Sequence, residues 1–361
     1  QQQTQSPAQT QNQNQNLDQD QDQDQDQDQN QNLDQDQDQD QAQTQSQIEH
    51  QSSGELVVAE QYGLAYAPLQ VMRAKGFLEA ELPGYRIKWS RLGNTAAIRE
   101  AMLAGRLDVG FMGIPPFLIG YDRGMEWRIF TGLSEAPLGL VTWRKDIQSL
   151  ADFGPGDRIA LPQPGSIQHI LLSMACERQL GRAQALDDSL VTMNHPDGLN
   201  ALLSRGDISA HFTSPPYLME ELSAEGTHMV VSGREAMGGD FTFIVGVATE
   251  QLLRTAPEAV SALRRALAVS IDYMETHPGE VADLLAEEYG ISTAKLSDYL
   301  QWEGLQYTQR LLGLSRFIEF MSAQDYLQGP IASGDVLSEC LARDAAAAAT
   351  PGVTPGASDG N

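Results

Sequence analysis

The sequence predicts a two-lobe α/β fold in which each lobe is a mixed, mainly parallel sheet flanked by helices. The first observation is that short apolar strands alternate with helical segments from residue 54 onward, a pattern typical of parallel sheets covered on both faces. The second is that the order of elements over residues 101–118 recurs over residues 201–218. A repeated unit in each half indicates two sheets rather than one.

The expected elements follow from apolar runs and from the residues that bound them. A glycine comes directly after the helical runs that end at Lys75, Ala104 and Leu180, and Thr255 is the expected N-cap of the long helix 257–276. The expected strands are 56–59, 85–89, 107–112, 127–133, 158–161, 208–212, 228–232 and 242–249, and the expected helices are 67–75, 95–104, 167–180, 198–204, 257–276, 279–289, 293–302, 315–327 and 335–343.

The repeated unit places a helix start beyond the carboxyl end of a strand. Gly113-Ile114-Pro115-Pro116 follows one strand and Ser214-Pro215-Pro216 follows its counterpart, and proline suits a first helical turn because its missing N–H has no partner there anyway. Gly93-Asn94-Thr95 and Gly165-Ser166 have the same form. Ligands bind at such strand ends, where helix N-termini offer free N–H groups. The sequence therefore predicts a ligand cleft between the lobes.

The net charge of −26 is unevenly spread, with −11 of it in the first 53 residues. Residues 1–53 contain ten Asp and one Glu, with no Lys or Arg. This Gln/Asp-rich stretch has too few apolar residues to form a core, so we expect a disordered tail there and a second, Ala/Pro/Gly-rich tail over 345–361. The body between them is also acidic, which argues against nucleic acid as a partner because phosphate binding needs clustered Lys and Arg.

The ends and the cysteines bear on the cellular setting. The chain begins with Gln1 and its first methionine is Met72, so we expect that a natural start has been removed. No apolar run reaches 18 residues, and no transmembrane helix is expected. Cys176 and Cys340 allow at most one disulfide, and Cys176 lies in an apolar helical run where a small buried side chain is expected.

Several motifs occur together in the order of a known family. They are Tyr62-Gly63-Leu64-Ala65-Tyr66-Ala67-Pro68, Ala74-Lys75-Gly76-Phe77-Leu78, Gly93-Asn94, Leu107-Asp108-Val109-Gly110, Gly113-Ile114-Pro115-Pro116 and Gly206-Asp207-Ile208-Ser209-Ala210. This order resembles the periplasmic substrate-binding proteins of ABC importers for nitrate, sulfonates, taurine and the pyrimidine precursor of thiamine. The resemblance covers residues 55–330, which is nearly all of the expected ordered chain.

The resemblance implies a type II periplasmic-binding-protein-like fold with two crossing strands, near 138–143 and 241–247. Lobe one would comprise 54–140 plus 246–344, and lobe two 141–245. It also implies a periplasmic or extracytoplasmic monomer, with the N-terminal tail as a membrane tether. Such a protein captures a small-molecule solute and delivers it to ABC permease subunits, with no catalytic residue, metal or cofactor of its own.

By motif position, the resemblance also places the residues that line the cleft. From lobe one and the first crossing they are Tyr62, Tyr66, Ala67, Gly93, Asn94, Thr95, Gly113, Ile114, Pro115, Ser134 and Glu135, and from lobe two and the return crossing they are Ser166, Gln168, His169, Ser214 and Asp240. Most have a plainer interpretation as well: the tyrosines as packing residues, Asn94 and Thr95 as helix caps, and Asp240 as a turn cap.

The charges near these loops favour an organic solute. Glu135 and Asp240 are unfavourable neighbours for a small inorganic anion, and Arg91 is the only basic residue close to the loops. Backbone N–H groups at helix starts can still hold a sulfonate, and tyrosines can wall an apolar part. We therefore expect a sulfonate, a taurine-like compound or a heteroaromatic compound such as a pyrimidine.

Two alternatives remain open. An enzyme of the pyrimidine-precursor synthase type resembles the same fold, but its cysteine-rich segment has no counterpart in a chain with two isolated cysteines. The sequence has no Gly-x-Ser-x-Gly elbow and no phosphate-binding Gly-x4-Gly-Lys, and its six histidines show no metal-ligand spacing. A ligand-sensing receptor domain is the second alternative, because a separate signalling chain would leave no trace in this sequence.

Overall fold

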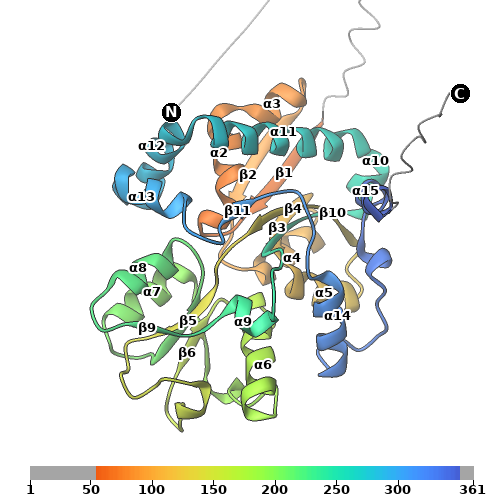
Figure 1. Ribbon diagram of the computed structural model, residues 1–361. Helices are drawn as coiled ribbons and strands as arrows, with labels where there is room; N and C mark the ends of the chain where they lie inside the picture. Colours follow the sequence, from red (N-terminus) through yellow and green to blue (C-terminus); the bar gives the residue numbers. More distant parts are fainter. Residues whose placement is uncertain (1–53, 350–361) are drawn as a thin grey trace, which may run out of the picture. The chain divides into compact units, whose positions relative to one another are not determined.

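The computed structural model of the protein describes residues 54–349 (Figure 1). The expected N-terminal tail lies outside the described residues, as does 350–361. The last described helix, α15 (Glu339–Ala349), extends into the segment that was expected to be a C-terminal tail. Its run of consecutive alanines explains the extension, because alanine has the highest helix propensity.

The described strands form two mixed sheets. The first has the order β11-β4-β10-β3-β1-β2 and the second the order β7-β6-β8-β5-β9. The strands of the first sheet are β1 (Glu55–Glu60), β2 (Arg86–Arg91), β3 (Val109–Gly113), β4 (Trp127–Glu135), β10 (Ile244–Thr249) and β11 (Gln306–Tyr307). The strands of the second sheet are β5 (Gly139–Thr142), β6 (Ile159–Leu161), β7 (Leu190–Thr192), β8 (Ala210–Thr213) and β9 (His228–Ser232).

Most strands in each sheet point the same way. In the first sheet β1 pairs in parallel with both β2 and β3, while β10 runs antiparallel to β3 and β4. In the second sheet β6 pairs in parallel with β7 and β8, and β5 runs antiparallel to β8 and β9. The carboxyl ends of the parallel strands in each sheet therefore share one edge.

Helices flank both sheets (Figure 1). Those packed with the first sheet are α2 (Ala67–Lys75), α3 (Phe77–Glu81), α4 (Thr95–Leu103), α5 (Ile114–Asp122), α10 (Glu250–Thr255), α11 (Pro257–Thr276), α12 (Pro278–Tyr289), α13 (Thr293–Leu300), α14 (Leu314–Ala323) and α15. Those of the second sheet are α6 (Ile167–Leu180), α7 (His195–Leu203), α8 (Tyr217–Ser223) and α9 (Gly233–Met237). Because β2 and β3 lie on opposite sides of β1, right-handed crossovers put α2 and α4 on opposite faces.

The chain passes between the sheets twice in the described residues. The first passage, 136–138, joins β4 to β5, and the second, 238–243, joins α9 to β10. The crossings expected near 138–143 and 241–247 overlap these passages only in part, because β5 and β10 have already joined their sheets over most of those ranges. The predicted fold class, two mixed sheets with flanking helices, is confirmed.

Some elements have the bounds that the sequence predicts and others differ. The predicted helices 67–75, 167–180 and 257–276 have the observed bounds. Thr255 was wrong as the N-cap of α11, whose N-cap is Ala256. The Thr255 hydroxyl instead donates to the Gln251 carbonyl at the end of α10, a short helix that was not predicted.

The two Pro-Pro sequences open their helices differently. Pro115 and Pro116 lie in the first turn of α5, as expected. Pro216 instead is the N-cap of α8, which begins at Tyr217, and the Pro215–Pro216 peptide bond is cis. Cys176 is buried, as predicted, and burial raises the pKa of its thiol to about 12. Among residues 54–349, no helix is long and apolar enough to cross a membrane.

Gly132 on β4 marks a place where backbone approaches backbone. Its N–H donates to the Gln309 carbonyl, and a Cβ at this position would lie 1.9 Å from the carbonyl oxygen of Arg310. We expect Gly132→Ala to lower the free energy of unfolding by about 3 kcal/mol, because a backbone carbonyl cannot rotate away as a side chain can. Urea denaturation measures this. Gly279→Ala, where nothing lies within 4 Å, is the control; an equal loss in both variants would contradict the steric explanation.

Candidate functional site

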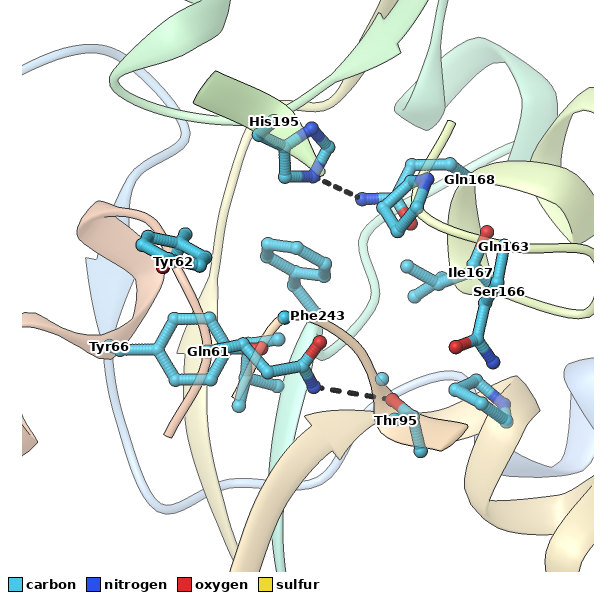
Figure 2. Close-up of a pocket in the computed structure, with 15 residues that line it drawn as sticks. Gln61, Tyr62, Tyr66, Thr95, Gln163, Ser166, Ile167, Gln168, His195 and Phe243 are labelled. Atoms are coloured by element: carbon cyan, nitrogen blue, oxygen red, sulfur yellow. Dashed lines mark hydrogen bonds between the residues drawn. The ribbon is translucent and has the colours of Figure 1, made fainter. Parts of the chain in front are cut away.

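A small cavity lies between the carboxyl ends of the strands of the two sheets (Figure 2). It is lined by Gln61, Tyr62, Tyr66, Gly93, Thr95, Gly113, Pro116, Phe243 and Ile244 on the side of the first sheet, and by Pro162, Gln163, Ser166, Ile167, Gln168 and His195 on the side of the second. Its volume is about 30 Å³, which is room for one or two water molecules.

Strand direction explains why these residues meet. Gln61 follows the last residue of β1, Pro162 follows β6, and Ile244 is the first residue of the antiparallel β10. Four helices begin at the cavity wall, α4, α5, α6 and α7, because each follows a parallel strand. The first N–H groups of a helix have no intrahelical acceptor and carry partial positive charge. The cavity therefore offers hydrogen-bond donors without any cationic side chain.

The lining is electrically neutral. None of its residues is Lys, Arg, Asp or Glu. Burial and the neighbouring His211 hold the pKa of His195 well below 6.5, so its imidazole is uncharged at neutral pH. Burial, with a smaller effect of Glu60, raises the pKa of Tyr66, which stays a neutral phenol.

Gln61 presents a fixed acceptor to the cavity. Its Nε2 donates to Thr95 Oγ1 at 3.2 Å and to the Phe111 carbonyl at 3.1 Å. With both amide hydrogens used inside the first sheet, the orientation of the side chain is set. In Figure 2 its Oε1 points away from Thr95, toward the middle of the cavity.

The start of α4 joins the two sheets. Asn94 Oδ1 accepts from the Ala97 N–H at 3.0 Å, which caps the helix. The next free donor, the Ala96 N–H, is bound at 3.1 Å by Oε1 of Gln163, which comes from the second sheet. A glutamine oxygen thus occupies one helix N-terminus across the cavity, where an oxygen of a ligand would otherwise find a donor.

The start of α6 leaves two donors free. Ser166 Oγ accepts from the His169 N–H at 3.3 Å, while His169 Nδ1 accepts from the Gly165 N–H at 2.8 Å and its Nε2 lies 3.1 Å from Asp187. These bonds hold the loop and the first turn in place. Among the described residues, no acceptor binds the N–H of Ile167 or of Gln168, the first two residues of the helix.

An ion-pair cluster lies beside the tyrosines. Glu60, the last residue of β1, is fully buried and bonds Arg73 at 2.6 Å and Arg91 at 2.8 Å, and Glu288 pairs with both arginines. The Arg91 guanidinium lies over the Tyr62 ring, 5.7 Å from its centroid. Arg91, the basic residue singled out in the sequence, is therefore matched by two carboxylates and supports Tyr62 from outside the lining.

The structure brings part of the predicted site together. Of the predicted residues, those in the lining are Tyr62, Tyr66, Gly93, Thr95, Gly113, Ser166 and Gln168. Asn94 and His169 stand directly behind the lining as the supports described above. Ala67, Ile114 and Pro115 are buried in α2 and α5.

The remaining predicted residues lie elsewhere. Ser134 is buried on β4, where its Oγ has no hydrogen-bond partner among the described residues, and Ser214 is buried before α8. Glu135 bonds Arg310 at 3.0 Å, and Asp240 is exposed beside Arg234. The acidic residues that the sequence suggested as cleft neighbours are thus outside the lining of this cavity.

The cavity also contains residues that the sequence analysis missed. They are Gln61, Pro116, Pro162, Gln163, Ile167, His195, Phe243 and Ile244. A usable signal existed for His195, because Asn194 before His195-Pro196 is an N-cap followed by a proline in the first turn, whereas the predicted helix began at 198. Gln163 carries no such signal, since its role depends on a helix from the other sheet.

Removing the Ser166 hydroxyl tests whether the α6 start is built as described. We expect Ser166→Ala to lower the free energy of unfolding by about 1 kcal/mol, since the His169 N–H loses its acceptor. Chemical denaturation measures the change. Ser261→Ala on the exposed face of α11 is the control, because that hydroxyl bonds only the Pro257 carbonyl of its own helix. No difference between the two variants would contradict the capping role.

Comparison with known proteins gives structural matches of low sequence identity. The alkanesulfonate-binding protein SsuA from Xanthomonas axonopodis pv. citri, bound to MOPS, is 18% identical with a TM-score of 0.67, covering 79% of this chain and 98% of that chain. The periplasmic aliphatic sulphonate binding protein SsuA from Escherichia coli is 18% identical with a TM-score of 0.63, covering 81% and 100%. The Candida albicans CA3427 gene product, described as having the generic periplasmic binding protein fold, is 13% identical with a TM-score of 0.62, covering 77% and 92%.

These likenesses confirm the two-lobe type II periplasmic-binding-protein fold. No curated protein matches the chain. One family model does, described as NMT1/THI5 like, over residues 65–281. That range is more than half of the chain and includes the starts of α4, α5, α6 and α7 at the cavity. The chain belongs to the NMT1/THI5-like family.

Proposed function

We propose that this protein is the solute-binding component of an ABC import system, and that the cavity between its two sheets captures a small organic solute for delivery to permease subunits in the membrane. The observation that carries the proposal is the neutral cavity where four helices begin. A site of this kind can hold a polar or charged group by backbone donors and release it again unchanged.

The lining favours a solute with an oxygen-rich headgroup and a small apolar part. The free N–H groups of Ile167 and Gln168 suit a sulfonate oxygen, and Gln61 Oε1 suits an amine or hydroxyl at the other end. Tyr62, Tyr66 and Phe243 provide flat apolar walls. A taurine-like compound meets all three features, and an alkanesulfonate meets the first and the last. A heteroaromatic compound such as a pyrimidine meets the last two.

Two of the similar structures agree with this class, because both are sulfonate-binding proteins and one holds MOPS, itself a sulfonate. Their sequence identity of 18% does not transfer the ligand, and the lining of the cavity carries the proposal. An extracytoplasmic location, a monomer and a tether through the N-terminal tail belong to the same proposal.

Entry of a solute requires the two sheets to separate. A cavity of about 30 Å³ is far smaller than the ~300–1,000 Å³ of drug-sized ligand sites. The chain passes between the sheets only over 136–138 and 238–243 within the described residues, so rotation there would open the cavity. The bond from Ala96 to Gln163 is one that opening must break.

A ligand screen tests the proposal. Thermal unfolding is followed with taurine, ethanesulfonate, nitrate, a hydroxymethylpyrimidine and a flavin, and positive compounds are titrated by calorimetry. We expect a sulfonate or taurine to raise the melting temperature, since a solute at 100 times its Kd adds about 2.7 kcal/mol of stability. If no compound binds while mass spectrometry shows that the protein converts one of them to product, the enzyme alternative replaces this proposal.

Gln61→Ala tests the location of the site. We expect the variant to bind the solute found in the screen about tenfold more weakly, because the cavity loses its fixed acceptor. Gln251→Ala on the exposed face of α10 is the matched control and should bind as the unmodified protein does. Unchanged affinity of Gln61→Ala would mean that the solute binds elsewhere.

A further inference from the structure

A line of four hydrogen-bonded side chains runs from the cavity into the second lobe. Gln168 Nε2 lies 3.2 Å from His195 Nε2, His195 Nδ1 lies 3.1 Å from His211 Nε2, and His211 Nδ1 lies 2.5 Å from Glu221 Oε1. Figure 2 shows the first of these bonds at the cavity wall. We refer to Gln168, His195, His211 and Glu221 as the relay.

The relay is closed to solvent at its inner end. His211 and Glu221 are both fully buried, and Glu221 Oε2 has no hydrogen-bond partner among the described residues. The Tyr217 ring stacks on His195 at a centroid distance of 5.7 Å, and Gly198 leaves the space that the His211 ring fills. A buried carboxyl group with an unpartnered oxygen is costly to keep ionised.

The relay can run in two directions that differ by one proton. With Glu221 ionised, His211 Nδ1–H donates to it, His195 Nδ1–H donates to His211, and Gln168 Nε2–H donates to His195. With Glu221 protonated, every bond reverses, and His195 Nε2–H then needs an acceptor. A half-turn of the Gln168 amide supplies its Oε1 and leaves both Nε2 hydrogens for the cavity.

The surroundings of Glu221 favour the protonated form of its carboxyl group. Burial alone raises its pKa well above 4.5. Burial lowers the pKa of His211 to about 3, and burial together with His211 lowers that of His195, so neither ring holds a second proton at neutral pH.

The neighbouring titratable groups point elsewhere. On α8, Glu220 bonds Lys295 and Tyr299, and on α7, Asp197 bonds Asn194. Strands β5 and β6, next to His211 in the sheet, contain no titratable residue. The third group on these elements, Tyr217, has its pKa raised by burial and stays neutral.

We propose, building on the proposed function, that the relay sets the hydrogen-bond polarity of the cavity and couples binding of an anionic oxygen to uptake of one proton by Glu221. An anion in the neutral cavity is repelled by an ionised Glu221 and meets the acceptor side of Gln168. Protonation removes the charge and turns the Gln168 donors toward the ligand. Gln168 contacts the ligand, and His195, His211 and Glu221 are positioning residues.

The sign of the pH effect follows directly. Glu221 is protonated below its folded pKa, where the donors face the cavity, and it ionises as the pH rises through that value. The affinity for an anion is therefore highest at low pH and falls as the pH rises, by up to about tenfold per unit for one linked proton. A neutral solute would show a much smaller dependence.

Calorimetric titration with ethanesulfonate tests the coupling, because its sulfonate stays ionised throughout and all pH dependence comes from the protein. The measurement is made between about pH 5 and pH 9, in buffers of different ionisation enthalpy. We expect the unmodified protein to lose affinity with rising pH and to take up close to one proton per ligand above the Glu221 pKa. Glu221→Gln, which is neutral and can donate to His211, should keep its low-pH affinity throughout and take up none.

Glu225→Gln is the matched control, since it removes one negative charge from the exposed segment after the same helix. Its affinity for ethanesulfonate and its proton uptake should depend on pH as those of the unmodified protein do. If the affinity of Glu221→Gln for ethanesulfonate depends on pH as that of the unmodified protein does, the proposal is overturned. That result would show that Glu221 is not the group whose ionisation changes the affinity.

A measurement without ligand separates the relay from the proposed function. Nitrogen-15 NMR of the imidazole rings reports which nitrogen of His195 and His211 carries the proton. We expect both rings to change from Nε2–H to Nδ1–H as the pH rises, and neither to change in Glu221→Gln. If ethanesulfonate does not bind but the rings change as expected, the relay stands and the sulfonate assignment fails; if the rings keep one tautomer at all pH values, the relay proposal fails whatever the ligand.

Discussion

The site depends on helices that begin at the carboxyl ends of parallel strands in two separate sheets. Because α4, α5, α6 and α7 all start at one cavity, their unpaired N–H groups provide its positive potential. The protein has no need for an arginine or lysine in the lining. A backbone N–H cannot rotate away from the cavity. Each of these N–H groups is therefore either bound by a capping side chain or free to bind a ligand.

The charged groups near the cavity are held outside it. Glu60 is fully buried at the end of β1, but two arginines bond it, and Arg91 in turn lies over the Tyr62 ring. Glu135 is engaged by Arg310. The acidity of the chain thus says little about the ligand, because arginines pair with Glu60 and Glu135 while the lining of the cavity stays neutral. The sequence-based doubt about inorganic anions, which rested on Glu135 and Asp240, loses its geometric basis.

The sequence predicts those site residues whose structural role depends on their neighbours in sequence, and misses those whose role depends on another element of the fold. Thr95, Gly113 and Ser166 could be found because a strand, a small residue and a helix start are adjacent in sequence, and Asn94 and Ser166 are the caps their residue types favour. Gln163 could not, because its partner, the Ala96 N–H, belongs to the other sheet. His211 and Glu221 could not either, since only the packing of α7 against β8, and of α8 against α7 and β5, brings them into line. Sequence patterns locate the backbone of such a site; side-chain networks that cross elements require the fold.

The two lobes each contain a buried glutamate near the cavity, and the difference between them explains why only one can respond to a ligand. Burial raises the pKa of Glu60, but Arg91 and Arg73 oppose that effect through charge and hydrogen bonds. A proton added to Glu60 would leave two partly buried guanidinium groups with Glu288 as their one remaining carboxylate among the described residues, which is costly. Glu221 has no cationic partner, only a neutral histidine, so burial is the sole cause of its raised pKa. Glu221 can therefore gain or lose a proton without breaking an ion pair with a cationic side chain. The hydrogen bonds of the two histidines then reverse, and this changes the orientation of Gln168 at the cavity wall.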